Sequence, residues 1–230
     1  MQQNYQTGAV ILAAGKGTRM GGAVPKQHRL LQGEPMYMAS VRTFAAVPAI
    51  SEIVVVADRA HLQEVRATVE KVFDGDVSSE RLAAIVVEGG AERPDSVMAG
   101  LTALGRDIRY ALVHDGARPY ATTDLIARVA EAAAKFGAAV PCIRPRDTIR
   151  TAEKTLDRSA LYLVQTPQGF RKDVLMSAYE QAAQNGFAGT DDASYVEQLG
   201  IIPHLVEGEP GNLKITIPED LPEQEADNEC

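Results

Sequence analysis

Three basic side chains lie close together on a glycine-rich segment near the start of the chain. Lys16, Arg19 and Lys26 fall within LAAGKGTRMGGAVPKQ, residues 12–27, directly after an apolar run. Residues 1–33 contain no Asp or Glu, so no local carboxylate neutralises these charges. Glycines that follow a strand expose backbone N–H groups, which bind phosphate together with neighbouring cations. The segment therefore predicts a phosphate-binding loop rather than a plain tight turn.

This loop differs from the two common nucleotide-binding patterns. It lacks the terminal GK[ST] of a Walker A loop, and Met20 stands where the dinucleotide-binding pattern GxGxxG has its third glycine. The second half of the chain also lacks a YxxxK pair. A dinucleotide-dependent oxidoreductase is therefore disfavoured.

Two further segments place polar groups directly after apolar runs. VHDGARP puts Asp115 and Arg118 at the end of a predicted strand, where doubly wound sheets bind their ligands. In EGGAERPDSV, two glycines allow close approach to the backbone, and Ser96 offers a hydroxyl at the start of a helix. Ser96 fits a helix cap and a ligand contact equally well, and Arg93 fits a surface cation. His114 is expected to pack or form hydrogen bonds rather than to react.

The elements that must position these groups alternate along the chain. Five short apolar runs, bounded by glycine or charge, predict buried parallel strands over residues 8–14, 52–57, 83–88, 110–115 and 138–143. The segments between them predict helices over residues 36–47, 61–73, 94–104 and 124–136. The last of these begins after Thr122, a good N-cap residue, and stops before Gly137, a plausible C-cap. This order predicts an α/β fold with a doubly wound, mostly parallel Rossmann-like sheet.

The alternation stops after residue 143. Residues 144–164 are polar and lack a helical face, so we expect a protruding β-arm that is stable only if it packs on something, such as a second copy of the chain. Helices near residues 172–184 and 192–199, strands near 201–206 and 213–217, and a last helical turn then follow. We predict a single domain over residues 1–230, with residues 144–164 as a dimerisation arm and 222–230 as a solvated acidic tail.

Composition excludes several classes of protein. The 230 residues are 45% hydrophobic and 23% charged, which is ordinary for a folded globular protein. The net charge is −8, and the last twelve residues hold six acids and no base. An acidic chain with one small basic segment does not suggest nucleic-acid binding. The longest clean apolar run, AVILAA, is too short for a membrane span and follows no basic residue, so no membrane contact or secretory signal is predicted.

The metal-binding and redox residues are few. Cys142 and Cys230 lie far apart with no CxxC pattern, which argues against a disulfide framework or a zinc ribbon. The four histidines are scattered, with no HExxH or paired spacing, so no protein metal site is predicted. We expect a cytoplasmic protein.

Taken together, the motifs resemble one known family. AAGKGTRM followed by PKQ is similar to the signature of nucleotidyltransferases, and EGGAERPDSV, VHDGARP, RDT, DRS, QTPQ, TDDAS and NLKITIPEDL follow in the order typical of the 2-C-methyl-D-erythritol 4-phosphate cytidylyltransferase family. The resemblance extends from Gly8 to Leu221. It implies attack by the substrate's phosphate on the α-phosphorus of CTP, with release of pyrophosphate and with Mg²⁺ held mainly by the CTP phosphates.

The resemblance also implies roles for individual residues. The charged residues expected to stabilise the reacting phosphates are Arg19, Lys26, Arg158 and Lys214. The residues expected to contact CTP are Ala13, Ala14, Gly15, Lys16, Gly17, Gly89, Gly90 and Ser96. The residues expected near the polyol phosphate are Asp115, Arg118, Thr148, Thr166 and Thr190, although each threonine also fits a turn or a cap, and Thr190 could cap the following helix. Family members are homodimers whose arms cross, so that Arg158 would enter the partner's site, and the arm of this chain is shorter than in several relatives.

Three alternatives share part of this pattern. Ribitol-5-phosphate-type cytidylyltransferases have an AGG-like first loop, a VRN-like segment in place of DRS and SDAC in place of TDDAS, and this chain departs from them at all three. A glycosyltransferase is less favoured, because Asp74–Gly75–Asp76 follows a helix rather than a strand. A non-catalytic nucleotide-binding regulator is disfavoured by the presence of all four charged residues named above.

Overall fold

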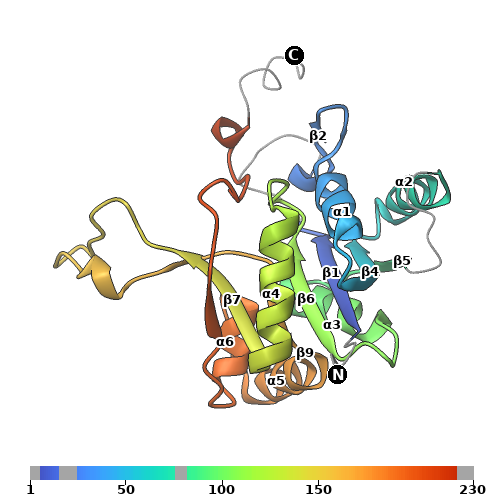
Figure 1. The fold of residues 1–230 in the computed structure, drawn as a ribbon. Coiled ribbons are helices and arrows are strands. Elements are labelled where there is room, and N and C mark those ends of the chain that lie inside the picture. The colour runs from blue at the N-terminus through green and yellow to red at the C-terminus, as the bar shows by residue number, and fades with distance from the viewer. Residues whose placement is uncertain (1–5, 16–24, 76–81, 222–230) are drawn as a thin grey trace.

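The protein is a layered α/β structure with one long projection (Figure 1). The computed structural model describes residues 6–15, 25–75 and 82–221. Within these ranges, eight strands form one sheet in the order β10–β7–β9–β6–β1–β4–β5, with β8 paired to β7. They are β1 (Thr7–Ala13), β4 (Ile50–Ala57), β5 (Ala83–Glu88), β6 (Tyr110–Asp115), β7 (Ala138–Ile143), β8 (Leu163–Val164), β9 (Gln168–Arg171) and β10 (His204–Glu207). A small hairpin of β2 (Leu30–Leu31) and β3 (Glu34–Pro35) precedes the first helix.

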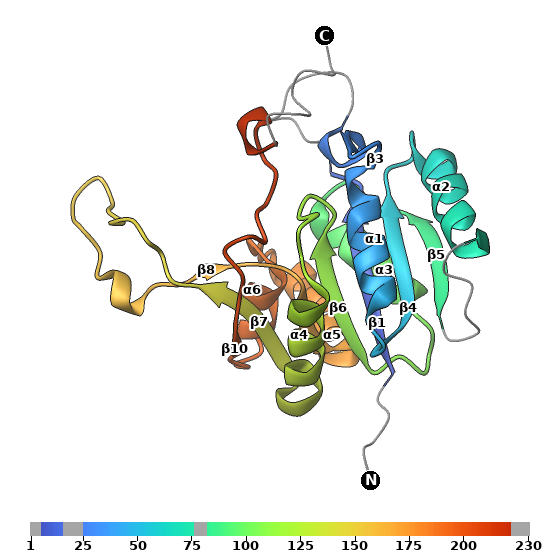
Figure 2. The same ribbon diagram turned by 45° about the horizontal axis from the view of Figure 1, so that its top comes forward.

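Helices cover both faces of the sheet. They are α1 (Met36–Ala46), α2 (Leu62–Gly75), α3 (Arg93–Ala103), α4 (Thr123–Phe136), α5 (Lys172–Asn185) and α6 (Asp192–Glu197). The apolar side chains of α1, α2 and α4 pack on one face, and those of α3, α5 and α6 pack on the other. Figure 2 shows the sheet between these two groups. The predicted doubly wound, mostly parallel fold is confirmed.

The strand sequences explain why both faces are covered. In β1, Ile11 belongs to the core beneath α1 and α4, whereas its neighbour Val10 belongs to the core beneath α3. Both side chains are fully buried, and β4 alternates in the same way. Because successive residues of a strand point to opposite faces, an uninterrupted apolar run requires cover on both sides.

Helix α4 shows how local sequence sets an element's ends. The Thr122 hydroxyl accepts the N–H of Leu125 at 3.1 Å, and Gly137 closes the helix with a left-handed φ of 85°. Both caps match the sequence prediction. A glycine adopts this conformation without the steric cost that a side chain would bring.

The structure corrects three details of the predicted sheet. Strand β7 does not pair with β6, because β9 is inserted between these two strands and runs antiparallel to both, and on its other side β7 pairs in parallel with β10. Residues 213–217 form no strand, and β5 lies at the edge of the described sheet, where Ala83 and Ile85 are exposed rather than buried. The predicted final helical turn is the short helix η4 (Pro218–Asp220).

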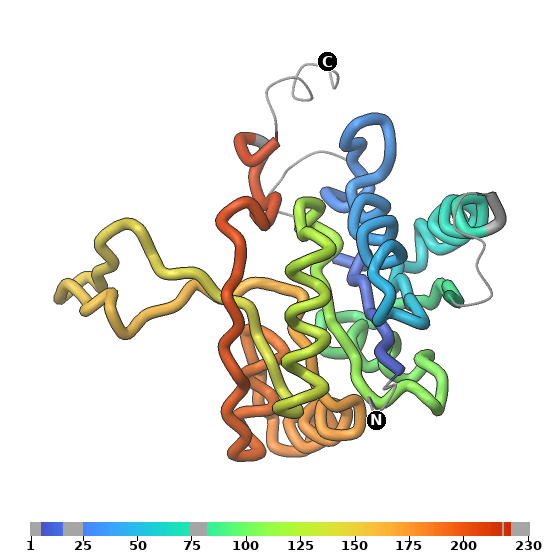
Figure 3. Tube along the Cα trace, in the orientation of Figure 1, coloured from blue at the N-terminus to red at the C-terminus, as the bar shows by residue number. Residues whose placement is uncertain are grey.

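Residues 144–164 project away from the body of the molecule, as Figure 3 shows. The projection contains a bridge between Arg150 and Thr155 and a short helix, η3 (Arg158–Ala160). It returns to the sheet through β8, which pairs antiparallel with the end of β7. Most of its residues are exposed.

Across the described part of the chain, no helix has both the length and the apolar character that crossing a membrane requires.

The contact between β9 and α4 leads to a prediction about stability. A Cβ atom added to Gly169 would lie 2.9 Å from Ala133 Cβ and 3.1 Å from Val129 Cγ1. Helix α4 therefore could not pack this closely on β9 if residue 169 carried a side chain. We expect Gly169→Ala to lower the free energy of unfolding by about 1–3 kcal/mol, the usual cost of overpacking. Urea denaturation measures the change. Gly211→Ala is the matched control, because nothing lies within 4 Å of its added Cβ, and equal stability of the two variants would contradict the prediction.

Candidate functional site

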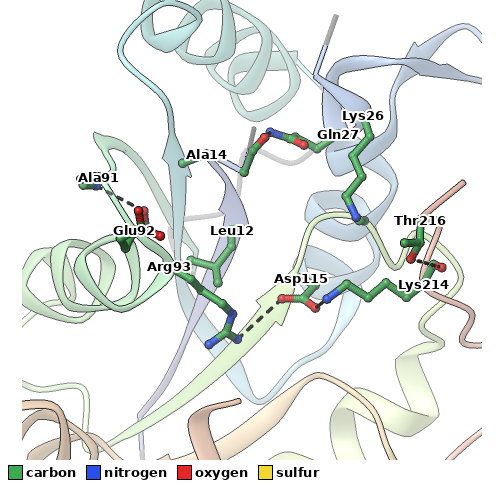
Figure 4. Close-up of a pocket in the computed structure, with 14 residues that line it drawn as sticks. Leu12, Ala14, Lys26, Gln27, Ala91, Glu92, Arg93, Asp115, Lys214 and Thr216 are labelled. Atoms are coloured by element: carbon green, nitrogen blue, oxygen red, sulfur yellow. Dashed lines mark hydrogen bonds and ion pairs between the residues drawn. The ribbon is translucent and has the colours of Figure 1, made fainter. Parts of the chain in front are cut away.

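A cavity of about 390 Å³ opens at the carboxyl ends of β1 and β6, the point where the strand order reverses. Doubly wound sheets bind ligands at such a point because the loops that follow the two strands diverge there. The cavity is lined by Leu12, Ala14, Gly15, Lys26, Gln27, Gly90, Ala91, Glu92, Arg93, Ser96, Asp115, Ala117, Lys214 and Thr216 (Figure 4). It therefore unites the glycine-rich loop, the loop before α3, the end of β6 and the segment after β10.

Asp115 lies at the centre of this arrangement, with a cation on each side. Lys214 donates from Nζ to Oδ2 at 2.6 Å, and Arg93 Nη2 lies 3.6 Å from Oδ1. Figure 4 shows the two cations approaching the carboxylate from opposite directions. Burial by itself would raise the pKa of Asp115, but Lys214 and then Arg93 hold that pKa well below its usual range. The carboxylate is therefore ionised at any physiological pH.

Arg93 is not the surface cation that the sequence suggests. Its guanidinium forms two hydrogen bonds with Asp192, at 3.0 and 2.7 Å, and the Asp192 side chain is fully buried. The Tyr179 hydroxyl donates to Asp192 at 2.6 Å. Burial opposes the charge of Arg93, but Asp192 and Asp115 raise its pKa above the ordinary value. The guanidinium is thus fixed by the pair with Asp192 while its exposed part faces the cavity.

A chain of hydrogen bonds behind β6 fixes the backbone of Asp115. The Asp115 N–H donates to Thr166 Oγ1 at 3.1 Å, and Thr166 Oγ1 lies 3.2 Å from His114 Nδ1. His114 Nε2 lies 3.1 Å from the carbonyl of Arg118. Complete burial lowers the pKa of His114 to about 4, so the ring is neutral, with Nε2 donating and Nδ1 accepting. His114 is therefore a hydrogen-bonding core residue, as predicted.

The segment that carries Lys214 is held by backbone contacts rather than by a strand. The Ile215 N–H donates to the Ala117 carbonyl at 2.9 Å, and Arg118 Nη1 donates to the Asn212 carbonyl at 2.7 Å. Asn212 Nδ2 in turn donates to the Thr166 carbonyl at 2.8 Å. Arg118, expected near the polyol phosphate, lies beneath this segment and outside the cavity lining.

The glycine-rich loop contributes Lys26 and Gln27 from the short helix η2 (Lys26–His28). Lys26 Nζ donates to the Ile215 carbonyl at 3.0 Å, next to Lys214. Gln27 is buried and donates from Nε2 to the carbonyls of Ala13, at 2.8 Å, and Gly15. Gln27 thereby fixes the end of β1 against η2. Three residues expected in this loop, Lys16, Gly17 and Arg19, lie outside the described residues.

The loop before α3 forms the wall opposite Lys214. Glu92, not Ser96, is the N-cap of α3, and it forms a capping box with Asp95. Ser96 is buried beside the cavity, where its hydroxyl accepts the Gly90 N–H at 3.2 Å. A Cβ atom at Gly89 would lie 2.7 Å from Ser96 Oγ and 2.8 Å from Ala14 Cβ. Glycine at this position is thus what allows the loop to close on the end of β1.

The cavity brings together seven residues of the sequence prediction and leaves others elsewhere. The seven are Ala14, Gly15, Lys26, Gly90, Ser96, Asp115 and Lys214. The described residues outside its lining are Ala13, Gly89, Arg118, Thr148, Arg158, Thr166 and Thr190. Arg158 and Thr148 are exposed on the projecting arm, and Arg158 donates to the Arg146 carbonyl at 2.6 Å. Thr190 is exposed and does not cap α6, because Asp191 does.

The residues not assigned from the sequence include four with polar side chains, Gln27, Arg93 and Thr216 in the cavity lining and Asp192 behind it. Asp192 belongs to the TDDAS motif. The motif indicated that this segment contributes to the site, but it did not indicate that Asp192 is the acid that pairs with Arg93. Arg93 and Asp192 are 99 positions apart, so their pairing depends on tertiary structure. Of the four, Gln27 carried the clearest signal, because it follows Lys26 directly in the PKQ motif.

Comparisons with known proteins agree with this architecture. The family model of 2-C-methyl-D-erythritol 4-phosphate cytidylyltransferase matches residues 7–227. The enzyme of that name from Geobacillus kaustophilus is 41% identical over 229 residues, covering 95% of this chain and 94% of the relative, and the one from Symbiobacterium thermophilum is 43% identical over 218 residues, covering 92% and 88%. The crystal structure of 4-diphosphocytidyl-2C-methyl-D-erythritol synthase from Anaerococcus prevotii superposes with a TM-score of 0.80 at 26% identity, covering 97% of this chain and 96% of that one.

The pair of Arg93 and Asp192 predicts a difference between two conservative substitutions. Asp192→Asn leaves the guanidinium without its buried counter-charge, so we expect the free energy of unfolding to fall by about 3–5 kcal/mol. The matched control is Asp173→Asn, which breaks a similar two-bond pair with Arg171 on the exposed surface and should cost about 1 kcal/mol or less. Urea denaturation of both variants measures the difference, and equal losses would show that the buried pair has no special importance.

Proposed function

This chain belongs to the 2-C-methyl-D-erythritol 4-phosphate cytidylyltransferase family, and from that premise we propose that the cavity between β1 and β6 is its active site. The protein is a cytidylyltransferase that transfers the cytidylyl group of CTP to 2-C-methyl-D-erythritol 4-phosphate, a step of isoprenoid precursor biosynthesis. The products are 4-diphosphocytidyl-2-C-methyl-D-erythritol and pyrophosphate. The observation that supports the site most directly is the gathering of Lys26, Arg93 and Lys214 around one cavity.

The reaction needs charge stabilisation more than proton transfer. A phosphate oxygen of the methylerythritol phosphate attacks the α-phosphorus of CTP, a new P–O bond forms, and the bond to the β-phosphate oxygen breaks. The attacking phosphomonoester has a second pKa of about 6, so it is an anion at neutral pH and requires no general base. The site must therefore align two anions and neutralise the charge that develops on the α-phosphate.

We assign this neutralisation to Lys26 and Lys214, together with Arg19. The Lys26 ammonium contacts the carbonyl of Ile215, the neighbour of Lys214, so the two lysines enter the cavity side by side. Each ammonium is held by an acceptor of the protein, the Ile215 carbonyl for Lys26 and Asp115 for Lys214. Phosphate oxygens would take over part of these contacts when the substrates bind.

We place the cytosine and ribose against the wall opposite these lysines. That wall consists of Ala14, Gly15, Gly90 and Ser96, which are small residues with accessible backbone groups. Gly89 lies next to it, because a Cβ atom at Gly89 would lie 2.8 Å from Ala14 Cβ and 2.7 Å from Ser96 Oγ, and Ala13 precedes Ala14 in the chain. Backbone carbonyls in such a wall can accept the exocyclic amine of cytosine.

The carboxylates around the cavity fit a Mg²⁺ ion that is held mainly by the substrate. Asp115 is engaged by Lys214 and Arg93, and Glu92 caps α3, so the protein offers few uncommitted oxygens there. Mg²⁺ keeps several waters and binds through phosphate oxygens in such sites. When bound, it would neutralise charge on the phosphates of CTP and on the departing pyrophosphate.

We further propose that two chains form a dimer through the projecting arm. Arg158 lies on this arm and not at the cavity of its own chain. At the base of the arm, Tyr162, Leu163 and Val164 each expose 40% or more of their side chains, which favours cover by a second copy. Thr148 lies on the same arm, so the partner's cavity would receive Thr148 together with Arg158.

The assignment of Lys26 can be tested with a pyrophosphate-release assay. We expect the wild-type protein to require both CTP and methylerythritol phosphate, and Lys26→Ala at saturating CTP to lose about 10²–10³ in turnover, the usual effect of removing one preorganised charge. Lys71→Ala, on the exposed surface of α2, is the matched control and should keep normal turnover. Near-normal turnover of Lys26→Ala would remove Lys26 from the mechanism, and faster reaction with ribitol 5-phosphate would overturn the substrate assignment.

The shared site can be tested by co-expressing two inactive variants, Lys26→Ala and Arg158→Ala. In a mixed dimer with sites shared between chains, one site carries both changes and the other is intact. Random pairing makes about half of the dimers mixed, so about a quarter of wild-type activity should return.

The control mixture is Lys26→Ala with Lys214→Ala. Both residues line the cavity of the same chain, so every site of that mixed dimer keeps one lesion and no activity should return. Recovery in the control, or no recovery in the test mixture when mixed dimers are present, would contradict the proposed exchange of Arg158.

A further inference from the structure

Three side chains that can bind a metal meet next to the segment that carries Lys26, although His28 is far from Asp58 and His61 in the sequence. His28 ends the short helix η2, Asp58 follows β4, and His61 precedes α2. One ligand atom of each lies within 4.8 Å of the others. The sequence pattern of scattered histidines gave no sign of this cluster, because β4 and η2 are brought together only by the fold.

His28 presents an unused nitrogen to this cluster. Its side chain is only 3% exposed, and its Nε2 atom, which has no hydrogen-bond partner, lies 3.6 Å from Asp58 Oδ2. The ring also interacts with the backbone of Ala13. Nε2 thus faces a carboxylate oxygen without forming a hydrogen bond to it. A cation bound between these two atoms would give both of them a partner.

Asp58 is oriented for binding by its own backbone. Its Oδ1 atom accepts the N–H groups of Ala60, at 2.9 Å, and His61, at 3.2 Å. Oδ2 is left to face His28, and His61 Nδ1 lies 2.9 Å from both carboxylate oxygens. The rings of His28 and His61 are stacked with their centroids 4.3 Å apart, and one nitrogen of each lies within 3.6 Å of Asp58 Oδ2. Metal-binding residues are commonly fixed in this way by hydrogen bonds to their other atoms.

We propose that His28, Asp58 and His61 form a binding site for one divalent transition-metal ion, with Zn²⁺ the best fit. Two imidazoles and one carboxylate are ligands that Zn²⁺ accepts, whereas Mg²⁺ prefers oxygen ligands alone. Water would complete a tetrahedral site. The Asp58 and His61 side chains are 28% and 27% exposed, which gives the ion a route of entry past the buried His28.

The metal would act on structure rather than on the reacting phosphates. None of the three ligands lines the cavity, so the site is distinct from the place of the Mg²⁺–CTP complex. His28 is two residues from Lys26 and adjacent to Gln27, and Asp58 is adjacent to the end of β4. A bound ion would thus join η2 to the loop between β4 and α2, and would hold the segment that carries Lys26 against the sheet.

Zinc titration of the full chain after chelator treatment tests the proposal. We expect calorimetry to show one Zn²⁺ per chain, and Zn²⁺ to raise the temperature of unfolding. Asp58→Asn, which retains the oxygen that accepts the backbone N–H groups, and His61→Ala should each weaken binding by more than the ~10–100-fold caused by loss of a ligand's hydrogen-bond partner. His204→Ala is the matched control, because His204 lies on β10, outside the cluster, and this variant should bind like the wild type.

NMR signals of the histidine rings give a second measurement that requires no substitution. Sub-stoichiometric Zn²⁺ should perturb the rings of His28 and His61 and leave His204 unchanged. The proposal is wrong if the wild-type chain binds no Zn²⁺, or if Zn²⁺ perturbs other rings first. It is equally wrong if Asp58→Asn and His61→Ala bind Zn²⁺ as tightly as the wild type, which would point to another site such as the thiol of Cys230.

Discussion

The carboxylate of Asp115 is the group on which the arrangement of the cavity depends. It is only 14% exposed, so its charge must be compensated within the protein. Lys214 arrives from the segment after β10 and Arg93 from the start of α3, and Arg93 is fixed in turn by the buried Asp192 of α6. One acidic residue at the end of β6 thereby ties together three segments that are distant in the sequence. Compensation of this carboxylate therefore brings Lys214 and Arg93 to the cavity.

Each of these cations has an acceptor within the protein, and this has a consequence for catalysis. Lys214 contacts Asp115, Lys26 contacts the Ile215 carbonyl, and Arg93 is paired with Asp192. In the proposed mechanism, the positive charges are therefore already in position before the substrates bind, and little reorganisation would be needed when charge develops on the α-phosphate. The same contacts lower the free-energy cost of holding like charges close together in a cavity without an anion.

The sequence predicted the elements that repeat a simple pattern and missed those that depend on distant partners. Strand β1 is apolar throughout because both of its faces are buried, and Thr122 and Gly137 mark the ends of α4, so these features are local. Strand β9 contains a glycine and ends on an arginine, and only its pairing with β6 and β7 makes it a strand. Motifs likewise located Lys26 and Asp115, whereas the contact of Arg93 with Asp192 follows from the fold alone.

The antiparallel insertion of β9 also explains where the arm lies. Strand β7 ends at Ile143, at the end of the sheet where the cavity lies, and the arm leaves the body of the molecule there (Figure 1). If β9 ran parallel to β7, the chain would have to return to the opposite end of the strands before it entered the sheet. Because β9 is antiparallel, the chain re-enters the sheet at the same end of the strands that it left. Helix α5 then begins after β9, at the opposite end. The base of the arm is thus fixed at the same end of the sheet as the cavity. This position agrees with the proposed exchange of Arg158 between two copies of the chain.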